Sequence, residues 1–106
     1  MILMQNIIDK DKTLMTIMFD KSVMKHLRCK VNDYVVVLQS NFKYNYFLLV
    51  KADTGYRIKR YPTKKKMWQV NVMYKFNYVP EFDTTPCTYY LKKNNSIRII
   101  LGKQHD

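Results

Sequence analysis

The chain has 106 residues, which is the length of one domain that can bury its own core. Hydrophobic residues make up 47% of it and aromatic residues 14%, a content that excludes a disordered tail. Nineteen Lys and Arg against eight Asp and Glu give a net charge of +11. Such an excess favours a polyanionic or acidic partner. We therefore treat residues 1–106 as a single basic domain.

Membrane insertion, secretion and metal binding are not indicated. No run of 18 uncharged apolar residues exists, so no transmembrane helix is expected. The first twelve residues, MILMQNIIDKDK, lack a leading basic region and a small-residue cleavage site, so no signal peptide is expected. Cys29 and Cys87 lie outside any common zinc-ligand spacing, and we expect no metal and no cofactor. Two cysteines are typical of a reducing compartment, here the cytoplasm.

The first half of the chain is expected to contain three strands and one short helix. Apolar residues predict a buried strand over residues 14–19, and β-branched residues predict strands over 34–38 and 46–50. Between the first two strands, Val23, Met24 and Leu27 have helical spacing and predict about two turns of helix. Either Asp20 or Ser22 could cap this helix, and residues 32–33 form a turn.

The second half is expected to be mostly strand. After a tight turn at residues 53–55, strands are predicted over 56–60 and 68–74. Residues 75–83 are predicted as a turn or helix, with Glu81 and Asp83 in a proline-flanked turn. The chain ends in a hairpin of strands 88–91 and 97–101 around Asn94 and Asn95.

The two halves follow a similar order of elements. The first three elements of residues 13–52 and of residues 67–101 coincide at an offset of 54 residues. We therefore predict a mainly β fold, a small β-barrel built from two βαββ-like halves with a pseudo-twofold axis and one or two short helices. An accidental likeness between two β-rich halves is the alternative.

A nineteen-residue segment, from Phe19 to Val37, reads FDKSVMKHLRCKVNDYVVV. It resembles the swapped-hairpin DNA-binding domain of the AbrB, SpoVT and MazE families. The family pattern is Pro-Lys-x-x-hydrophobic, then a Leu-Gly pair, then Lys-Pro-Gly-Asp-x-Val-x-Val. Asp20, Arg28 and Asn32 stand where the family has Pro, Gly and Gly. The matching positions are Lys21, Val23, Leu27, Lys30, Asp33, Val35 and Val37.

The resemblance implies a barrel on which the short helix packs Val23 and Leu27. It transfers one DNA-contacting basic residue, Lys25. The family completes its barrel by dimerisation, whereas the repeat would let one chain complete its own, so a monomer and a homodimer are both open. The chain also resembles small bacteriophage proteins, because its Lys, Asn and Tyr are read from AT-rich codons. That origin would place it in the cytoplasm of a bacterial host.

An enzymatic function is not expected. His26 and Cys29 are three residues apart on the predicted helix, as a base and a nucleophile could be, but no orienting group or oxyanion donor accompanies them. We therefore interpret Cys29 as a small core residue and His26 as a solvated one. His105 lies next to the chain end. Gly55 and Gly102 are the only glycines, too few for a phosphate-binding loop.

The densest charge lies in residues 56–75, YRIKRYPTKKKMWQVNVMYK, and no acidic residue occurs between Asp53 and Glu81. If strands 56–60 and 68–74 pair, residues 62–66 form a hairpin tip that can bring ammonium groups to phosphates, with Tyr61 and Trp68 nearby for stacking or packing. A β-ribbon also fits the major groove of DNA. On strand 56–60 we expect Arg57 and Lys59 to share one face with Tyr61, and Arg60 to lie on the other. The candidate nucleic-acid-binding residues are Arg57, Lys59, Arg60, Lys64, Lys65, Lys66 and, in second place, Lys25.

The sequence therefore predicts a non-enzymatic protein that binds nucleic acid, with duplex DNA as the expected partner and transcription regulation as the expected role. One alternative is that the lysines of the hairpin are simply solvated while Trp68 lies in the core. Another is a phage protein that binds and modulates an acidic host protein, and a third is a structural component of a virion. A membrane surface is the weakest option, because no predicted helix is long enough to lie in the interface.

Overall fold

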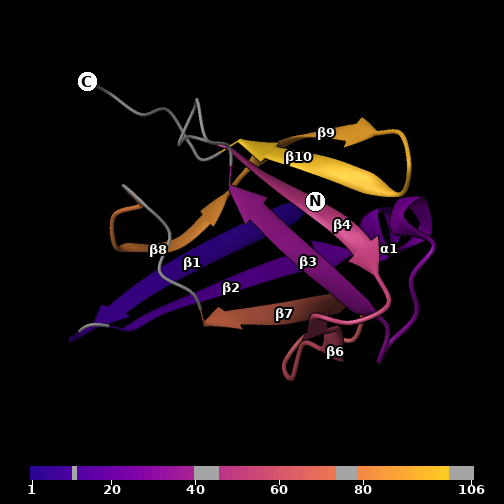
Figure 1. Ribbon diagram of the computed structural model, residues 1–106. Helices are drawn as coiled ribbons and strands as arrows, with labels where there is room; N and C mark the ends of the chain where they lie inside the picture. The colour runs from indigo at the N-terminus through magenta and orange to yellow at the C-terminus, as the bar shows by residue number, and fades with distance from the viewer. Residues whose placement is uncertain (11, 40–45, 74–78, 101–106) are drawn as a thin grey trace.

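A computed structural model describes residues 1–10, 12–39, 46–73 and 79–100 of the chain (Figure 1). All strand pairs in it are antiparallel, and the single helix of these residues lies between the second and third strands. The prediction of a mainly β protein is confirmed. The elements are β1 (Ile2–Asp9), β2 (Lys12–Asp20), α1 (Lys21–Leu27), β3 (Tyr34–Gln39), β4 (Tyr46–Ala52), β5 (Tyr56–Arg57), β6 (Lys59–Arg60), β7 (Met67–Met73), β8 (Phe82–Pro86), β9 (Thr88–Lys92) and β10 (Ser96–Ile100).

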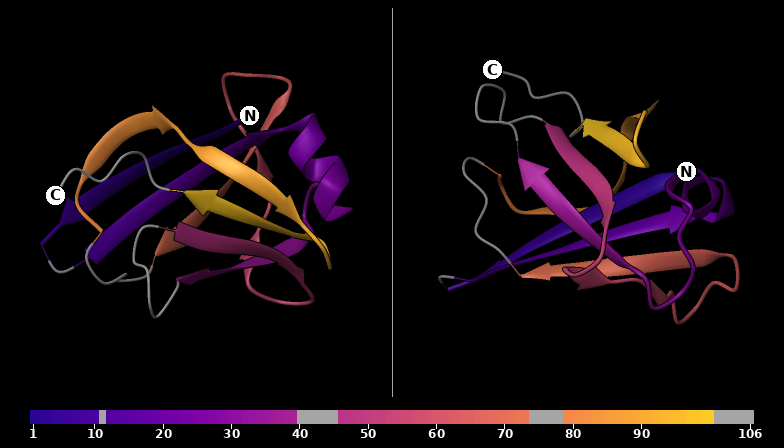
Figure 2. Two further views of the ribbon diagram at one scale, coloured as in Figure 1. Left: turned by 90° about the horizontal axis from the view of Figure 1, so that it is seen from above. Right: turned by 45° about the vertical axis from the view of Figure 1, so that its right-hand side comes forward.

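The strands form two five-stranded sheets that pack face to face. Sheet A has the order β6-β7-β2-β1-β8, and sheet B has the order β5-β3-β4-β10-β9. Figures 1 and 2 show β1, β2 and β7 on one side of the molecule and β3, β4 and β10 on the other. The described strands do not close into one barrel, so two packed sheets stand in place of the barrel expected from the sequence.

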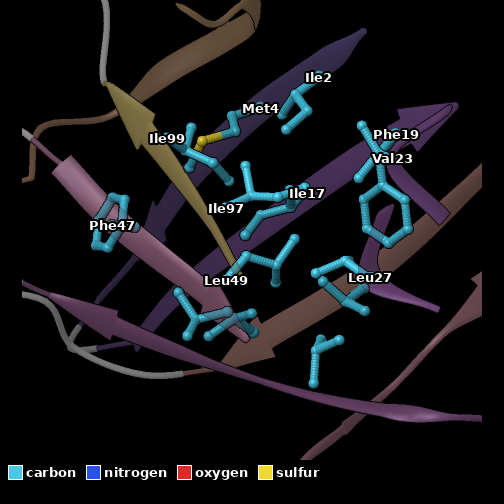
Figure 3. Packing of buried hydrophobic residues seen from close by; sticks show 14 of the residues in the cluster. Ile2, Met4, Ile17, Phe19, Val23, Leu27, Phe47, Leu49, Ile97 and Ile99 are labelled. Carbon is cyan, nitrogen blue, oxygen red and sulfur yellow. The ribbon is translucent and has the colours of Figure 1, made fainter. Parts of the chain in front are cut away.

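The core lies between the sheets, because alternate residues of each strand point inward. On β2 the inward residues Met15, Ile17 and Phe19 are fully buried. Side chains of β4 and β10 in sheet B meet those of β1 and β2 in sheet A (Figure 3). Burying one such side chain contributes about 1.5–3 kcal/mol, so this layer dominates the stability of the fold. Other fully buried members are Ile2, Met4, Val35, Phe47, Leu49, Val70, Val72, Ile97 and Ile99.

Helix α1 lies at one end of the two sheets and buries its apolar stripe against the same core (Figure 1). The three residues that predicted it, Val23, Met24 and Leu27, are all buried. The helix ends at Arg28, which adopts the left-handed conformation with φ of 55°. Among the described residues, no helix has the length and apolar character needed to cross a bilayer.

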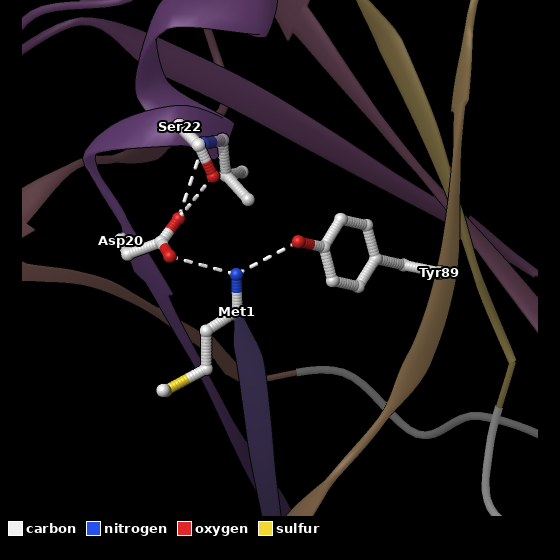
Figure 4. Close-up of polar contacts among 5 residues, drawn as sticks. Met1, Asp20, Ser22 and Tyr89 are labelled. Atoms are coloured by element: carbon white, nitrogen blue, oxygen red, sulfur yellow. Dashed lines mark hydrogen bonds and ion pairs between the residues drawn. The ribbon is translucent and has the colours of Figure 1, made fainter.

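Asp20 is the residue that caps the helix. Its Oδ1 atom accepts hydrogen bonds from the Val23 N–H at 3.3 Å and from the Ser22 hydroxyl at 2.7 Å (Figure 4). Its Oδ2 atom lies 2.8 Å from the N-terminal ammonium of Met1, which also donates to the Tyr89 hydroxyl at 2.8 Å. Asp20 thus joins the start of α1 to the start of β1 and, through Met1, to β9.

The predicted turns have the backbone conformations that their residues favour. Asn32, Asn94 and Asn95 have φ values of 76°, 62° and 55°, in the left-handed region that Asn tolerates. Gly55 has φ of 137°, and a Cβ atom there would lie 2.5 Å from the Val35 carbonyl oxygen. Only glycine therefore fits the turn between β4 and β5.

The chain passes directly from one sheet to the other at two corners. At the Ile58 corner, residues 56–66, Ile58 alone separates β5 of sheet B from β6 of sheet A. Ile58 is fully buried; its N–H donates to the Asp33 carbonyl at 2.8 Å, and its carbonyl accepts from the Asn32 N–H at 2.9 Å. At the Cys87 corner, residues 81–91, Cys87 alone separates β8 from β9, and its N–H donates to the Ile2 carbonyl at 2.9 Å.

The structure corrects the sequence prediction in three places. The predicted strand 56–60 is divided at Ile58 between the two sheets. Residues 82–86 are a strand that pairs with β1, and not the predicted turn or helix. Strand β1 itself was not predicted, because Asn6 interrupts its apolar residues; Asn6 is buried, and its Nδ2 donates to the Pro80 carbonyl at 2.8 Å. Residues 74–78, which cover the end of the predicted strand 68–74 and the start of the predicted turn or helix 75–83, and Leu101 lie outside the described residues.

Candidate nucleic-acid interface

The predicted basic hairpin is present. Strand β6 pairs with β7 in the register Lys59–Gln69 and Arg60–Trp68. The loop between them is closed by a hydrogen bond from the Tyr61 N–H to the Met67 carbonyl at 2.9 Å. Residues 62–66 therefore form the tip of the hairpin, as the sequence predicted.

Six basic side chains of the Ile58 corner form what we call the basic cluster. Every one of these six residues is exposed. Within the described ranges, the only ion pair joins the Met1 ammonium to Asp20, so no described carboxylate neutralises the cluster. Its charge is thus available to an external anion. The members are Arg57, Lys59, Arg60, Lys64, Lys65 and Lys66.

The expected arrangement of these cations on one strand is wrong. Arg57 lies in β5 and pairs with Tyr34 at the edge of sheet B, whereas Lys59 and Arg60 lie in β6 at the edge of sheet A. The crossing at Ile58 therefore distributes the basic cluster over the edges of both sheets and the adjoining loop. This surface is wider than the face of a single strand.

Lys25 lies on α1 and is also exposed. In all three ribbon views, α1 and the loop between β6 and β7 lie toward the same end of the molecule (Figures 1 and 2). Further exposed basic residues, Lys21, Arg28 and Lys30, lie on or next to α1. The helix thus carries basic charge at the end of the fold where the hairpin loop lies. Lys75, the last basic residue of the predicted segment, is outside the described residues.

The two aromatic residues of the hairpin have different environments. Trp68 is partly buried and packs against the core, which selects packing over stacking for this side chain. Tyr61 is half-buried and lines a groove on the outer face of sheet A. Tyr61 is therefore the aromatic residue of the hairpin that a ligand in this groove would contact.

This outer groove has a volume of about 250 Å³ and adjoins a hollow of about 60 Å³. Sequence reasoning missed it, because it needs β1 and β8, which were not predicted, beside β2 and β7. The available signal on β2 was Thr16, the one polar residue within its apolar run, which is only partly buried between the buried Met15 and Ile17 and lines the groove. The groove is lined by Gln5, Thr16, Met18, Tyr61, Pro62, Thr63, Gln69 and Thr84, and the smaller hollow adds Leu3, Lys64 and Met67.

Both cysteine side chains are at least partly buried. Cys29 is buried in the core, as predicted, and burial raises the pKa of its thiol. Cys87 is half-buried, and burial raises its pKa to about 11. Within the described ranges, no three His, Cys, Asp or Glu side chains form a group that could hold a metal ion.

His26 is half-buried, not fully solvated. Its Nε2 atom lies 2.8 Å from the Lys92 carbonyl oxygen and 3.1 Å from that of Ser96. These contacts join α1 to the turn between β9 and β10. His26 therefore has a structural role that the sequence prediction did not include, and His105 lies outside the described residues.

Comparison with protein-family models, curated proteins and solved structures found no match for this chain. The resemblance of residues 19–37 to the swapped-hairpin families therefore stays a prediction. The functional argument depends on the geometry and charge of the chain itself.

Proposed function

We propose that this chain is a non-enzymatic nucleic-acid-binding protein that holds the phosphates of duplex DNA with its basic cluster. The observation that carries the proposal is the gathering of six exposed cations at one corner, with no described carboxylate paired to any of them. DNA binds such a surface because Lys and Arg side chains that neutralise its phosphates release the counterions condensed on the DNA. Lys25 on α1 is a secondary contact.

The shape of the corner supports a duplex as the partner. Phosphates of duplex DNA lie in two rows along the groove edges, so cations on two sheet edges and a projecting loop can reach more than one phosphate. The two-stranded ribbon formed by β6 and β7 has the form that other proteins insert into a major groove. The role that follows is a small DNA-binding regulator acting in the cytoplasm, which would be the bacterial host cytoplasm if a phage encodes the chain.

The proposal is tested by fluorescence anisotropy with a duplex of about 25 base pairs between 50 and 200 mM salt. The test variant is the triple substitution Lys64→Glu, Lys65→Glu and Lys66→Glu. The matched control changes three exposed lysines elsewhere, Lys10→Glu, Lys12→Glu and Lys93→Glu, and has the same net charge. The proposal expects a large loss of affinity in the hairpin variant and a much smaller one in the control; equal losses, or no binding by the wild type, would contradict it.

A protein partner is the second candidate function, and the outer face of sheet B favours it. Leu38, Leu48, Arg98 and Tyr90 lie side by side on four neighbouring strands. Leu38 and Tyr90 are 53% and 52% exposed. If this face binds an acidic host protein or a neighbouring subunit of a virion, a pull-down with the wild-type chain should capture one dominant partner. The Leu38→Asn and Tyr90→Asn variants should no longer capture it.

We also propose that residues 13–52 and 67–101 are two related halves, and that residues 19–37 share the helix-and-turn geometry of the AbrB, SpoVT and MazE families. The pairing of β2 with β7 and of β4 with β10 supports the first idea, because each pair joins equivalent strands of the two halves. The left-handed conformations of Arg28 and Asn32, the two positions where the family has glycine, support the second. An experimental structure in which the halves fail to superimpose would overturn the duplication.

A further inference from the structure

The outer groove is built from two parts of the chain that are distant in sequence. Strands β1, β2 and β7 form its floor, since Gln5 pairs with Thr16 and Met18 pairs with Gln69 across them. The loop of the basic hairpin forms one wall with Tyr61, and Thr84 of β8 also lines the groove. The groove therefore adjoins the surface to which we assign phosphate binding.

The lining has the chemistry that recognises a heteroaromatic ring. Tyr61 and Met18 supply apolar and aromatic surface, while the amides of Gln5 and Gln69 supply hydrogen-bond donors and acceptors. Proteins bind unpaired bases by stacking on aromatic side chains and by hydrogen bonds to the base edges. The volume of about 250 Å³ is below the range of about 300–1,000 Å³ for pockets that hold drug-sized ligands, so the groove suits one ring system.

The charges around the groove differ between its two sides and would orient a bound nucleotide. Lys64 lines the adjoining hollow and begins the run of three exposed lysines. On β8, the Asp83 carboxylate accepts a hydrogen bond from the Gln5 amide nitrogen at 3.1 Å. A phosphate is attracted by the lysines and repelled by Asp83, so a nucleotide would keep its phosphate at the hairpin loop and extend its ring toward Gln5.

We propose that the outer groove accepts a single unpaired nucleobase from a strand whose phosphates contact residues 64–66. This inference rests on the proposed function, because it assigns the ligand of a site beside the basic cluster. The preferred ligand is therefore DNA with an unpaired nucleotide, such as a bulged duplex. A perfect duplex would bind through the basic cluster alone.

The test compares three fluorescent duplexes with the full chain in anisotropy titrations. One is perfectly paired, one carries a single-base bulge, and one carries an abasic residue at the same bulge. The two bulged duplexes have the same phosphates, so their difference reports the base. Tyr61→Leu is the groove variant and Tyr90→Leu is its matched control, because Tyr90 is exposed on the outer face of sheet B. Circular dichroism and thermal unfolding check that both variants fold.

The inference expects the base-containing bulge to bind about fivefold or more tightly than the abasic bulge, since stacking of one base contributes about 1–3 kcal/mol. Tyr61→Leu should remove this difference and Tyr90→Leu should keep it. Equal affinity of the wild type for both bulged duplexes would overturn the base site while leaving the proposed function intact. If the wild type bound none of the three duplexes, both the proposed function and this inference would be overturned.

Discussion

The two corners of the fold perform the same structural task with opposite charge. At each corner one residue, Ile58 or Cys87, takes the chain from an edge strand of one sheet to an edge strand of the other. Residues 56–66 of the Ile58 corner contain six basic residues and no acidic one. The corresponding eleven residues of the Cys87 corner, 81–91, contain two acidic residues and no basic one.

The two corners show that the crossing between the sheets does not depend on the charge of the residues that form it. Because the Cys87 corner crosses between the sheets without a single cation, the fold does not require cations at such a crossing. The basic cluster must therefore be explained by something other than folding, and an anionic partner is the explanation that we propose. The corners also differ in their fixation: Ile58 is tied to the turn at Asn32 and Asp33, whereas Cys87 is tied to Ile2 near the N-terminus.

The largest expected effect concerns burial at the two crossings. Ile58 is fully buried and Cys87 only partly, so we expect Ile58→Ala to lower the free energy of unfolding by about 2–5 kcal/mol and Cys87→Ala by about 1 kcal/mol or less. Urea unfolding followed by the fluorescence of Trp68 measures both. Similar losses at the two positions would show that the corners are equivalent in packing.

The next-largest effect is a difference in stability loss between substitutions at Gly55 and Pro86, the residues before the two crossings. Gly55→Ala places a Cβ atom against the Val35 carbonyl at a positive φ, and we expect a loss of about 1–3 kcal/mol in the free energy of unfolding. Pro86→Ala at the Cys87 corner mainly frees the unfolded chain, at a loss of about 0.4–1 kcal/mol. Thermal unfolding of both variants checks the order, and a larger loss at Pro86 would contradict it.

The charge difference between the corners can be tested by the salt dependence of DNA binding. Six phosphate contacts predict a fall in affinity of about 10³-fold between 50 and 200 mM salt, and three contacts predict a fall of about 40-fold. We expect the triple variant Arg57→Gln, Lys59→Gln and Arg60→Gln to show the smaller fall.

The control for this experiment neutralises the other corner. Glu81→Gln and Asp83→Asn keep oxygen acceptors for the Ile8 N–H and the Gln5 amide. Because neither residue is a cation, the slope of affinity against salt should stay that of the wild type. If net charge and not the basic cluster determined binding, the slope would become shallower in the first variant, at a net charge of +8, and steeper in the control, at +13.

The smallest expected effect concerns the N-terminal contacts near the Cys87 corner. Burial alone would raise the pKa of Asp20, but hydrogen bonds from the N-terminal ammonium, the Ser22 hydroxyl and the Val23 N–H outweigh it and lower the pKa. Asp20→Asn keeps an N-cap and removes the ion pair with Met1, so we expect a loss of about 0.2–1 kcal/mol at pH 7.

The sign of the pH dependence follows from that lowered pKa. The contribution of the Asp20 charge is fully present above the pKa of the unfolded chain, about 3.9, and is lost as pH falls through the lower folded pKa. The stabilities of wild type and Asp20→Asn should therefore converge in strong acid. A difference that persists unchanged below about pH 2 would show that the variant acts through packing instead.

Local patterns in the sequence predicted much of the fold. The helical spacing of Val23, Met24 and Leu27 located α1, and the asparagines at 94 and 95 located the last hairpin. The run of basic residues located the basic cluster as well. Strand β1 was missed because Asn6 is polar; its Nδ2 atom donates to the Pro80 carbonyl, a partner 74 residues away in sequence.

By itself the sequence determined the features that depend on neighbours along the chain: alternating strands, helix caps, turn residues and a cluster of like charges. Only the tertiary structure decided which strands pair, because hydrogen bonds between strands join residues far apart in sequence and do not depend on one local pattern. It divided residues 56–60 between two sheets, since burial of Ile58 required the chain to turn inward there. It also brought Gln5, Thr16 and Tyr61 to one groove, which no spacing in the sequence foretells.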